Sequence, residues 1–297
     1  METTKELPTR LSTHPAPARP TGGPEERAAG WLEAGFLPDP DTLVSFLVNA
    51  LYLFGDEGIA AYGEPPEAVT AGLTRLGHPV SAGRIRQLRK IPGGIRAGTP
   101  VYRRSGGALP RPVSEGGSDR AVFLDGALGR GDDARILEIL RAMRRTVKPG
   151  GLICFHIFDR DRAWGLAGER EVGRVRLRVG FAPETGRLTA RVIGGAIGVA
   201  GSNAKEETDI SASGFASIKT WNLGEIPALL RTAGLVLERA YGDWSGGSPE
   251  AGGAETGRLI VVAARPRAAR RPDQRNKDQG RNSSGTGRRG RTGDSSG

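Results

Sequence analysis

Two runs of apolar residues with an amphipathic segment between them stand near the middle of the chain, at 121–124 and 152–158. Short apolar runs without alternation are typical of strands that are buried on both faces of a parallel sheet. In the segment between them, Ile136 and Leu140 belong to an apolar set at helical spacing, with acidic residues at its start and basic residues at its end. A Pro-Gly-Gly sequence at 149–151 ends this helix. The pattern therefore predicts a βαβ unit of a doubly wound sheet.

A second kind of pattern follows. Residues 172–179 alternate apolar side chains with arginine, which indicates a strand with one buried and one solvated face. A Pro-Glu-Thr-Gly turn comes at 183–186, and residues 187–193 lead back. We therefore expect an antiparallel hairpin that is inserted into the α/β sheet, with its arginines in water.

The last regular segments lie before residue 265. A helix is expected over 223–233, with Asn222 as its amino-terminal cap and Gly234 just past its end. Residues 235–239 and 259–264 are then expected to form a final pair of antiparallel strands.

Composition divides the chain into five parts. We expect a proline-rich disordered leader, a small helical region, a linker rich in glycine and proline, an α/β domain and a basic disordered tail. Their bounds are 1–35, 36–92, 93–118, 119–264 and 265–297.

The helical region has three candidate helices. Residues 42–54 are too densely apolar for a surface helix, so we expect a mostly buried one. Residues 67–76 give a second helix, which breaks at Gly77. Ser81 is a suitable cap for a third segment over 81–89.

The charge of +10 sits mainly in the tail. Residues 265–297 hold ten Lys and Arg against three Asp, which leaves a net charge of +3 for the rest of the chain. A tail of this composition cannot bury enough apolar surface to fold. We favour a solvated tail without a partner, and salt-sensitive binding of DNA is the alternative.

Cysteine and histidine offer little chemistry. The single cysteine, Cys154, lies in an apolar run and is interpreted as a small buried hydrophobe. The histidines, His14, His78 and His156, are too far apart for a metal cluster, so we expect no metal. No segment has the length of apolar sequence that a membrane helix needs, and there is no hydrophobic signal segment at the start. We expect a cytoplasmic protein.

Residues 119–264 resemble the carboxyl-terminal half of a class I S-adenosylmethionine-dependent methyltransferase. The helix and Lys-Pro-Gly-Gly turn at 136–151 resemble the approach to that family's fifth strand. Residues 224–243, with their Ala-Gly-Leu exit, resemble its last helix and the strand after it, and the hairpin between matches an insertion in small-molecule members. The resemblance implies a Rossmann-like α/β fold, S-adenosyl-L-methionine as methyl donor and a small-molecule acceptor.

The same resemblance implies a set of cofactor-binding residues. Residues 121–124 would be the family's fourth strand, and Asp125, Gly126, Gly129 and Gly131 would line the cofactor cleft after it. Because only one helix separates these residues from the Lys-Pro-Gly-Gly turn, we prefer this interpretation to a displaced copy of the family's glycine loop.

That glycine loop, Gly-x-Gly-x-Gly after the first strand, has no good copy before residue 119. The nearest segment, 51–58, has only Gly55 and Gly58. Residues 73–83 resemble the passage from the first helix to the second strand, but Arg84 follows where an acidic residue should bind the ribose. We therefore expect a degenerate or missing cofactor loop.

Residues 67–89 also resemble the helix-turn-helix of Cro/repressor-type regulators. In that alternative, Ser81, Arg84, Arg86, Gln87 and Arg89 would face DNA from the second helix. The chain would then be a DNA-binding transcriptional regulator that carries a methyltransferase remnant. An ordinary helical pair of the methyltransferase itself is an equal interpretation.

His156 is a weak catalytic candidate. It lies on the strand predicted over 152–158, which Asp159 and Asp161 follow, and a general base near the end of that strand could remove a proton from an acceptor. A hydrogen-bonded structural histidine is the interpretation we prefer. Tyr241, Asp243 and Trp244 either shape an acceptor pocket or form a polar turn.

Overall fold

The structure of the chain is a computed structural model. It describes residues 28, 32, 37–62, 67–82, 115–124, 127–130, 132–172, 175–195, 215–250 and 257–267. The elements belong to one unit of the chain, residues 1–266.

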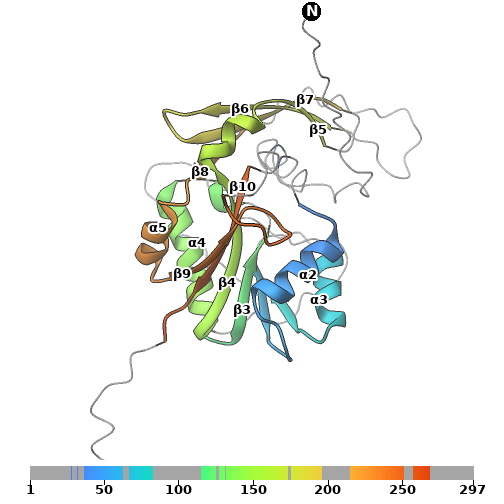
Figure 1. Cartoon of the computed structure of the whole chain (residues 1–297), viewed down its shortest axis with the longest axis vertical. Coiled ribbons are helices and arrows are strands. Elements are labelled where there is room, and N and C mark those ends of the chain that lie inside the picture. Colours follow the sequence, from blue (N-terminus) through green and yellow to red (C-terminus); the bar gives the residue numbers. More distant parts are fainter. Residues whose placement is uncertain are drawn as a thin grey trace, which may run out of the picture. The chain divides into compact units, whose positions relative to one another are not determined.

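Four parallel strands form the centre of this unit, in the order β2-β1-β3-β4 (Figure 1). Their bounds are Ile59–Tyr62 for β1, Val80–Ala82 for β2, Ser118–Phe123 for β3 and Val147–Asp159 for β4. All of β1 and residues 151–159 of β4 are buried, as expected for parallel strands with both faces covered. The pairing of β3 with β4 confirms the predicted βαβ unit.

Two antiparallel strands extend the sheet beyond β4. The strand β10, Arg258–Ala264, pairs with β4, and β9, Val236–Tyr241, pairs with β10. Both strands were expected from the sequence, as was their antiparallel pairing.

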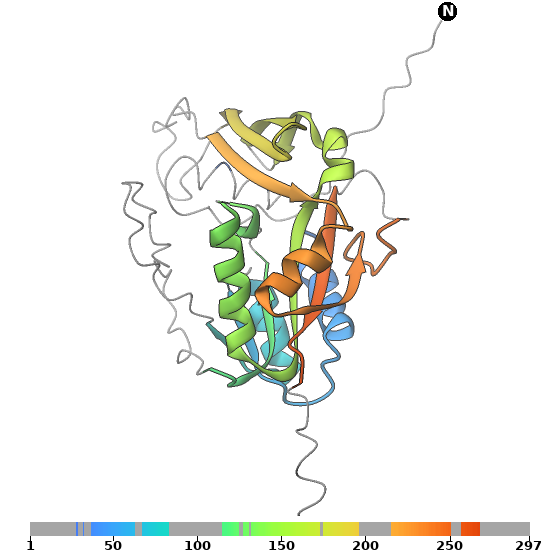
Figure 2. The same ribbon diagram turned by 90° about the vertical axis from the view of Figure 1, so that its left-hand side faces the viewer.

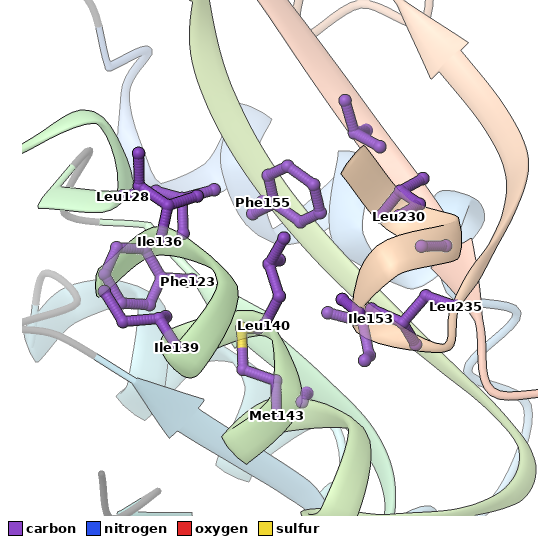
Figure 3. Packing of buried hydrophobic residues seen from close by; sticks show 14 of the residues in the cluster. Phe123, Leu128, Ile136, Ile139, Leu140, Met143, Ile153, Phe155, Leu230 and Leu235 are labelled. Carbon is purple, nitrogen blue, oxygen red and sulfur yellow. The ribbon is translucent and has the colours of Figure 1, made fainter. Parts of the chain in front are cut away.

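Helices cover both faces of the sheet, α2 and α3 on one side of β3 and β4 and α4 and α5 on the other (Figures 1 and 2). Their bounds are Pro40–Ala50 for α2, Glu67–Arg75 for α3, Asp133–Thr146 for α4 and Ile226–Ala233 for α5. Figure 3 shows the apolar layer under α4 and α5, where Ile136, Leu140 and Met143 of α4 belong to one cluster with Ile153 and Phe155 of β4. On the opposite face, residues of α2 and α3 pack on β1, β3, β4 and β10.

Local signals explain where α4 and α5 begin and end. Asp132 caps α4 by accepting a hydrogen bond from the Arg135 backbone nitrogen at 2.8 Å. Before α5, Asn222 and Glu225 exchange side-chain to backbone hydrogen bonds of 3.0 and 3.1 Å, which is a capping box. Gly234 ends α5 with a left-handed φ of 76°, a conformation that favours glycine.

The predicted hairpin is part of an antiparallel extension of the sheet, β5 to β8, which we call the second sheet and which is labelled at the top of Figure 1. Its strands are Gly168–Val172 (β5), Val175–Ala182 (β6), Arg187–Gly195 (β7) and Phe215–Trp221 (β8). In β6, Val175, Leu177 and Val179 are buried while Arg176 and Arg178 are exposed, which confirms the predicted alternation. The end of β4 pairs with β8, and the 3-10 helix η2, Arg160–Leu166, connects β4 to this sheet.

The amino-terminal region contains the expected helices α2 and α3, but it also contains strands that the sequence analysis missed. The strand β1 pairs with β3, so one sheet extends from this region to the α/β region. The predicted second helix of the helix-turn-helix is wrong at its start, because Val80–Ala82 is a strand that pairs in parallel with β1. Ser81 extends from that strand, and its hydroxyl donates to the Ile59 carbonyl at 3.3 Å. The passage from first helix to second strand, which the methyltransferase resemblance assigned to residues 73–83, matches α3 and β2.

Candidate functional site

The carboxyl ends of the parallel strands lie side by side at one edge of the sheet. Tyr62, the last residue of β1, is opposite Phe123, the last of β3, and Ala61 is opposite Ala82 of β2. In open α/β sheets ligands bind outside this edge. We therefore call the strand ends at Tyr62, Ala82 and Phe123 the ligand edge.

The predicted cofactor residues follow β3. Asp125, Gly126 and Gly131 lie outside the described residues. Gly129 belongs to the 3-10 helix η1, Ala127–Gly129, where a Cβ would come within 2.5 Å of Ile218 Cγ2 and 2.8 Å of the Lys219 carbonyl oxygen. A glycine is therefore needed there for η1 to pack against β8.

The connection from β1 to α3 occupies residues 63–66, and its sequence is Gly-Glu-Pro-Pro. It stands where a dinucleotide-type fold has its glycine-rich turn, between the first strand and the first helix. The sequence analysis looked for that turn at 51–58, a segment that precedes β1 instead of following it. Proline has no backbone N–H, so Pro65 and Pro66 remove two amide donors from this connection.

His156 lies at the same level as the ligand edge, on β4, and is completely buried. Its Nε2 is 2.9 Å from the carbonyl oxygen of Leu124, the residue directly after β3. Burial lowers the pKa of His156 well below its usual range, and the nearby guanidinium of Arg258 lowers it further. A neutral, completely buried imidazole suits the structural role that the sequence analysis preferred over a general base.

Arg258, which the sequence analysis missed, is the first residue of β10 and is only 1% exposed. Its Nη1 is 2.9 Å from Nδ1 of His156 and 3.4 Å from Nε2. Its guanidinium also lies over the ring of Phe158, with Cζ 5.0 Å from the ring centroid. The only sequence signal for Arg258 was its position directly before the apolar run 259–264. An arginine at such a position is more commonly exposed to solvent at the end of a strand, so it did not indicate a buried contact.

Asp159 ends β4 and is buried, with 6% exposure. Its side chain caps η2 by accepting a hydrogen bond from the Asp161 backbone nitrogen at 3.1 Å, and it lies 3.5 Å from Arg162 Nε. Burial raises the pKa of Asp159. These contacts fix the turn from the central sheet into the second sheet.

A groove of about 510 Å³ lies between α2 and the end of β9. Three aromatic rings line it: Phe46 meets Tyr241 and Trp244 edge to face, with both pairs of ring centroids 5.2 Å apart. Asp41 and Arg239 also line the groove. Trp244 in turn contacts His156 edge to face at 5.6 Å, so the aromatic wall of the groove reaches the residue that binds Leu124.

Within the described ranges, no group of histidine, cysteine and acidic residues could hold a metal ion. Cys154 is completely buried, and burial raises the pKa of its thiol to about 12, which supports its interpretation as a small hydrophobe. None of the described helices is long and apolar enough to cross a membrane. The other DNA-facing candidates, Arg84, Arg86, Gln87 and Arg89, lie outside the described residues, as does most of the basic tail.

Solved structures with a similar fold are methyltransferases. An S-adenosylmethionine-dependent methyltransferase from Clostridium acetobutylicum matches with a TM-score of 0.53 at 11% identity, over 77% of this chain and 93% of that one. The chain has the fold of class I methyltransferases. The CcbJ methyltransferase from Streptomyces caelestis matches with a TM-score of 0.50 at 14% identity, over 78% of this chain and 91% of that one.

Comparisons of the sequence alone found no related protein. No protein-family model matches the chain, and no curated protein matches it significantly. The solved structures that match this chain do not support the predicted helix-turn-helix.

Proposed function

We propose that the chain is an S-adenosylmethionine-dependent methyltransferase that acts on a small-molecule acceptor. The observation that carries the proposal is the sheet order β2-β1-β3-β4, continued by the antiparallel β10 and β9, together with the methyltransferase fold of the structures it matches. This order brings the ends of β1 and β3 together at the ligand edge. The cofactor would bind there, with Asp125 and Gly126 beside its polar groups.

The chain's residues at the ligand edge fit this cofactor in part. Asp125 offers a carboxylate after β3, which suits the amino group of the cofactor's methionine portion. The β1–α3 connection offers one glycine, Gly63, and two prolines, so it has fewer amide donors than a glycine-rich loop. This composition supports a degenerate cofactor loop, and we expect weaker cofactor binding than a complete loop would give.

The acceptor would enter from the groove between α2 and β9. Its volume of about 510 Å³ lies in the range of small-molecule sites. Tyr241 is opposite Ile260, which is opposite His156, so the aromatic wall lies level with the ligand edge. Phe46, Tyr241 and Trp244 would bind an apolar or planar part of the acceptor, and Asp41 and Arg239 would select its polar groups.

When bound, S-adenosylmethionine supplies an electrophilic methyl group. Asp125 and Gly126 would hold the cofactor while a lone pair of the bound acceptor takes up that methyl group, and the acceptor's proton would go to solvent. The protein's contribution would be to orient the acceptor and exclude water, because alignment of two bound reactants can supply most of the rate gain in such a transfer. We assign no general base, since His156 is buried and neutral.

The test is titration of the purified chain with S-adenosylhomocysteine, followed by calorimetry and thermal unfolding. A free ligand concentration of one hundred times Kd should raise the free energy of unfolding by about 2.7 kcal/mol. The D125N variant should bind about tenfold more weakly, because it loses a charge-assisted contact. D56N, at an exposed turn before β1, is the matched control and should bind normally. No stabilisation of the unaltered chain at millimolar ligand would overturn the proposal.

A further inference from the structure

Arg258, His156 and Leu124 form a buried chain of contacts from β10 through β4 to the end of β3. The guanidinium Nη1 of Arg258 lies 2.9 Å from Nδ1 of His156, and Nε2 of His156 lies 2.9 Å from the Leu124 carbonyl oxygen. Leu124 and His156 are completely buried, and Arg258 is 1% exposed. The Asp125 and Gly126 pair proposed for the cofactor begins at the next residue.

The hydrogen-bonding roles of His156 in this series of contacts are fixed. A carbonyl oxygen only accepts, so Nε2 of His156 must carry the ring proton and donate it to Leu124. Nδ1 is then unprotonated, and the guanidinium beside it opposes a second proton on the ring. His156 is therefore held as one neutral tautomer whose N–H points at the end of β3.

Burying a guanidinium is expensive, and a buried charge adds little net stability even when it has partners. An apolar residue at position 258 would suit the strand β10, whose next five residues are all buried and apolar. A charged side chain at this place is better explained by the geometry that it imposes. Phe158 under the guanidinium and Trp244 against the imidazole restrict both side chains further.

The Leu124 carbonyl oxygen, which His156 anchors, belongs to the peptide group at which the chain leaves β3. The Leu124 carbonyl shares a planar peptide group with the amide nitrogen of residue 125. A hydrogen bond that fixes this oxygen also fixes the direction in which the chain leaves β3 at the ligand edge. Residues 125 and 126 start from that peptide group.

We propose that His156 and Arg258 are positioning residues: His156 anchors the Leu124 carbonyl directly after β3, Arg258 holds His156 in the required tautomer, and the point from which the chain continues toward the proposed cofactor site is thereby fixed. This inference rests on the proposed function, because the segment that begins at Asp125 is proposed to bind S-adenosylmethionine. Neither residue touches the reacting atoms in this proposal.

The test is the affinity for S-adenosylhomocysteine, measured by calorimetry on the full chain and four variants. H156L removes the donor, R258M removes the guanidinium, and H156Q keeps an amide that can donate to Leu124. C154A is the matched control, because Cys154 is a buried residue of the same strand that lies two positions before His156. Thermal unfolding of each variant shows that it is folded.

We expect H156L and R258M to bind the ligand about tenfold more weakly, as expected for a lost hydrogen bond at a binding segment. H156Q should bind within about threefold of the unaltered chain, because an amide N–H replaces the imidazole N–H. C154A should bind as the unaltered chain does. Should H156L not fold, R258M takes its place, and binding by R258M equal to that of the unaltered chain would then overturn the inference.

Two results would overturn the inference. If the unaltered chain binds the ligand and H156L binds it equally well, the anchor has no role in binding. If H156Q binds as weakly as H156L, the N–H donor is not what positions the segment. Absence of binding by the unaltered chain would instead overturn the proposed function, and this inference with it.

Discussion

The two faces of the central sheet differ in what they carry. Under α4 and α5, the face is a continuous apolar layer that includes Ile153, Phe155 and Ile157 of β4. Figure 3 shows Ile153 and Phe155 in this layer. The intervening residues of β4 face α2 and α3, and they include Cys154 and His156. The groove, its aromatic wall and the His156–Arg258 contact are thus associated with the α2/α3 side. One face mainly stabilises the fold, while the other supplies the groups that we connect to ligand binding.

The largest expected effect comes from the stabilising face. Leu140 of α4 is completely buried in the apolar layer, so L140A should lower the free energy of unfolding by about 2–5 kcal/mol. R141A, next in sequence and exposed, removes one surface hydrogen bond to the Thr232 carbonyl at 3.3 Å and should change it by less than about 1 kcal/mol. Urea denaturation of both variants measures the difference. Where L140A remains folded, its affinity for S-adenosylhomocysteine should be unchanged, and a loss of affinity would break the division between the faces.

A smaller effect should appear on the other face as a pH dependence of stability. The pKa of His156 is lowered in the folded chain, so the unfolded chain binds a proton there first as the pH falls. Stability that His156 contributes is therefore present above the unfolded pKa of about 6.5 and is lost below it, by at most about 1.4 kcal/mol per pH unit. Urea denaturation between pH 7 and pH 5 should show this loss, and H156Q should show a shallower one. Equal slopes for both chains would contradict a buried neutral His156.

The smallest effect concerns Cys154, which lies on the same side as His156 but behaves as an apolar residue. Because burial raises the pKa of its thiol to about 12, the native chain should not react with iodoacetamide at pH 8, whereas the chain in urea should react. C154A should change the melting temperature little, because alanine removes only one buried sulfur atom. Mass spectrometry after a timed reaction measures the labelling. Rapid labelling of the native chain would show that this side opens to solvent near β4.

The sequence predicted the elements whose patterns are long or strongly apolar. Residues 121–124 and 152–158, the helix between them, and the β6–β7 hairpin all agree with the structure. The strand β1 was missed because its four residues, Ile-Ala-Ala-Tyr, include two alanines, which give a weak apolar signal next to a densely apolar helix. The strand β2 has three residues, too few to show a period, and Ser81 there suggested a helix cap instead.

Only the candidate site residues that come directly after a predicted strand could be found from the sequence. The placing of Asp125 and Gly126 after β3 rests on local pattern, because a polar pair ends an apolar run. The contact of His156 with Arg258 joins residues 102 apart in sequence, and burial of both depends on how β10 pairs with β4. The groove depends in the same way on α2 lying beside the end of β9. Local periodicity carries no information on such tertiary contacts.

The most direct measurement of cofactor binding at the ligand edge is hydrogen–deuterium exchange of the full chain with and without S-adenosylhomocysteine. We predict that the ligand slows exchange in peptides that cover the end of β1 with residues 63–66 and the end of β3 with residues 124–126, because the strand ends at Tyr62 and Phe123 are paired at that edge. Peptides from α4, under the stabilising face, should change least. Slowing confined to other parts of the chain, or none at saturating ligand, would contradict a cofactor site at the ends of β1 and β3.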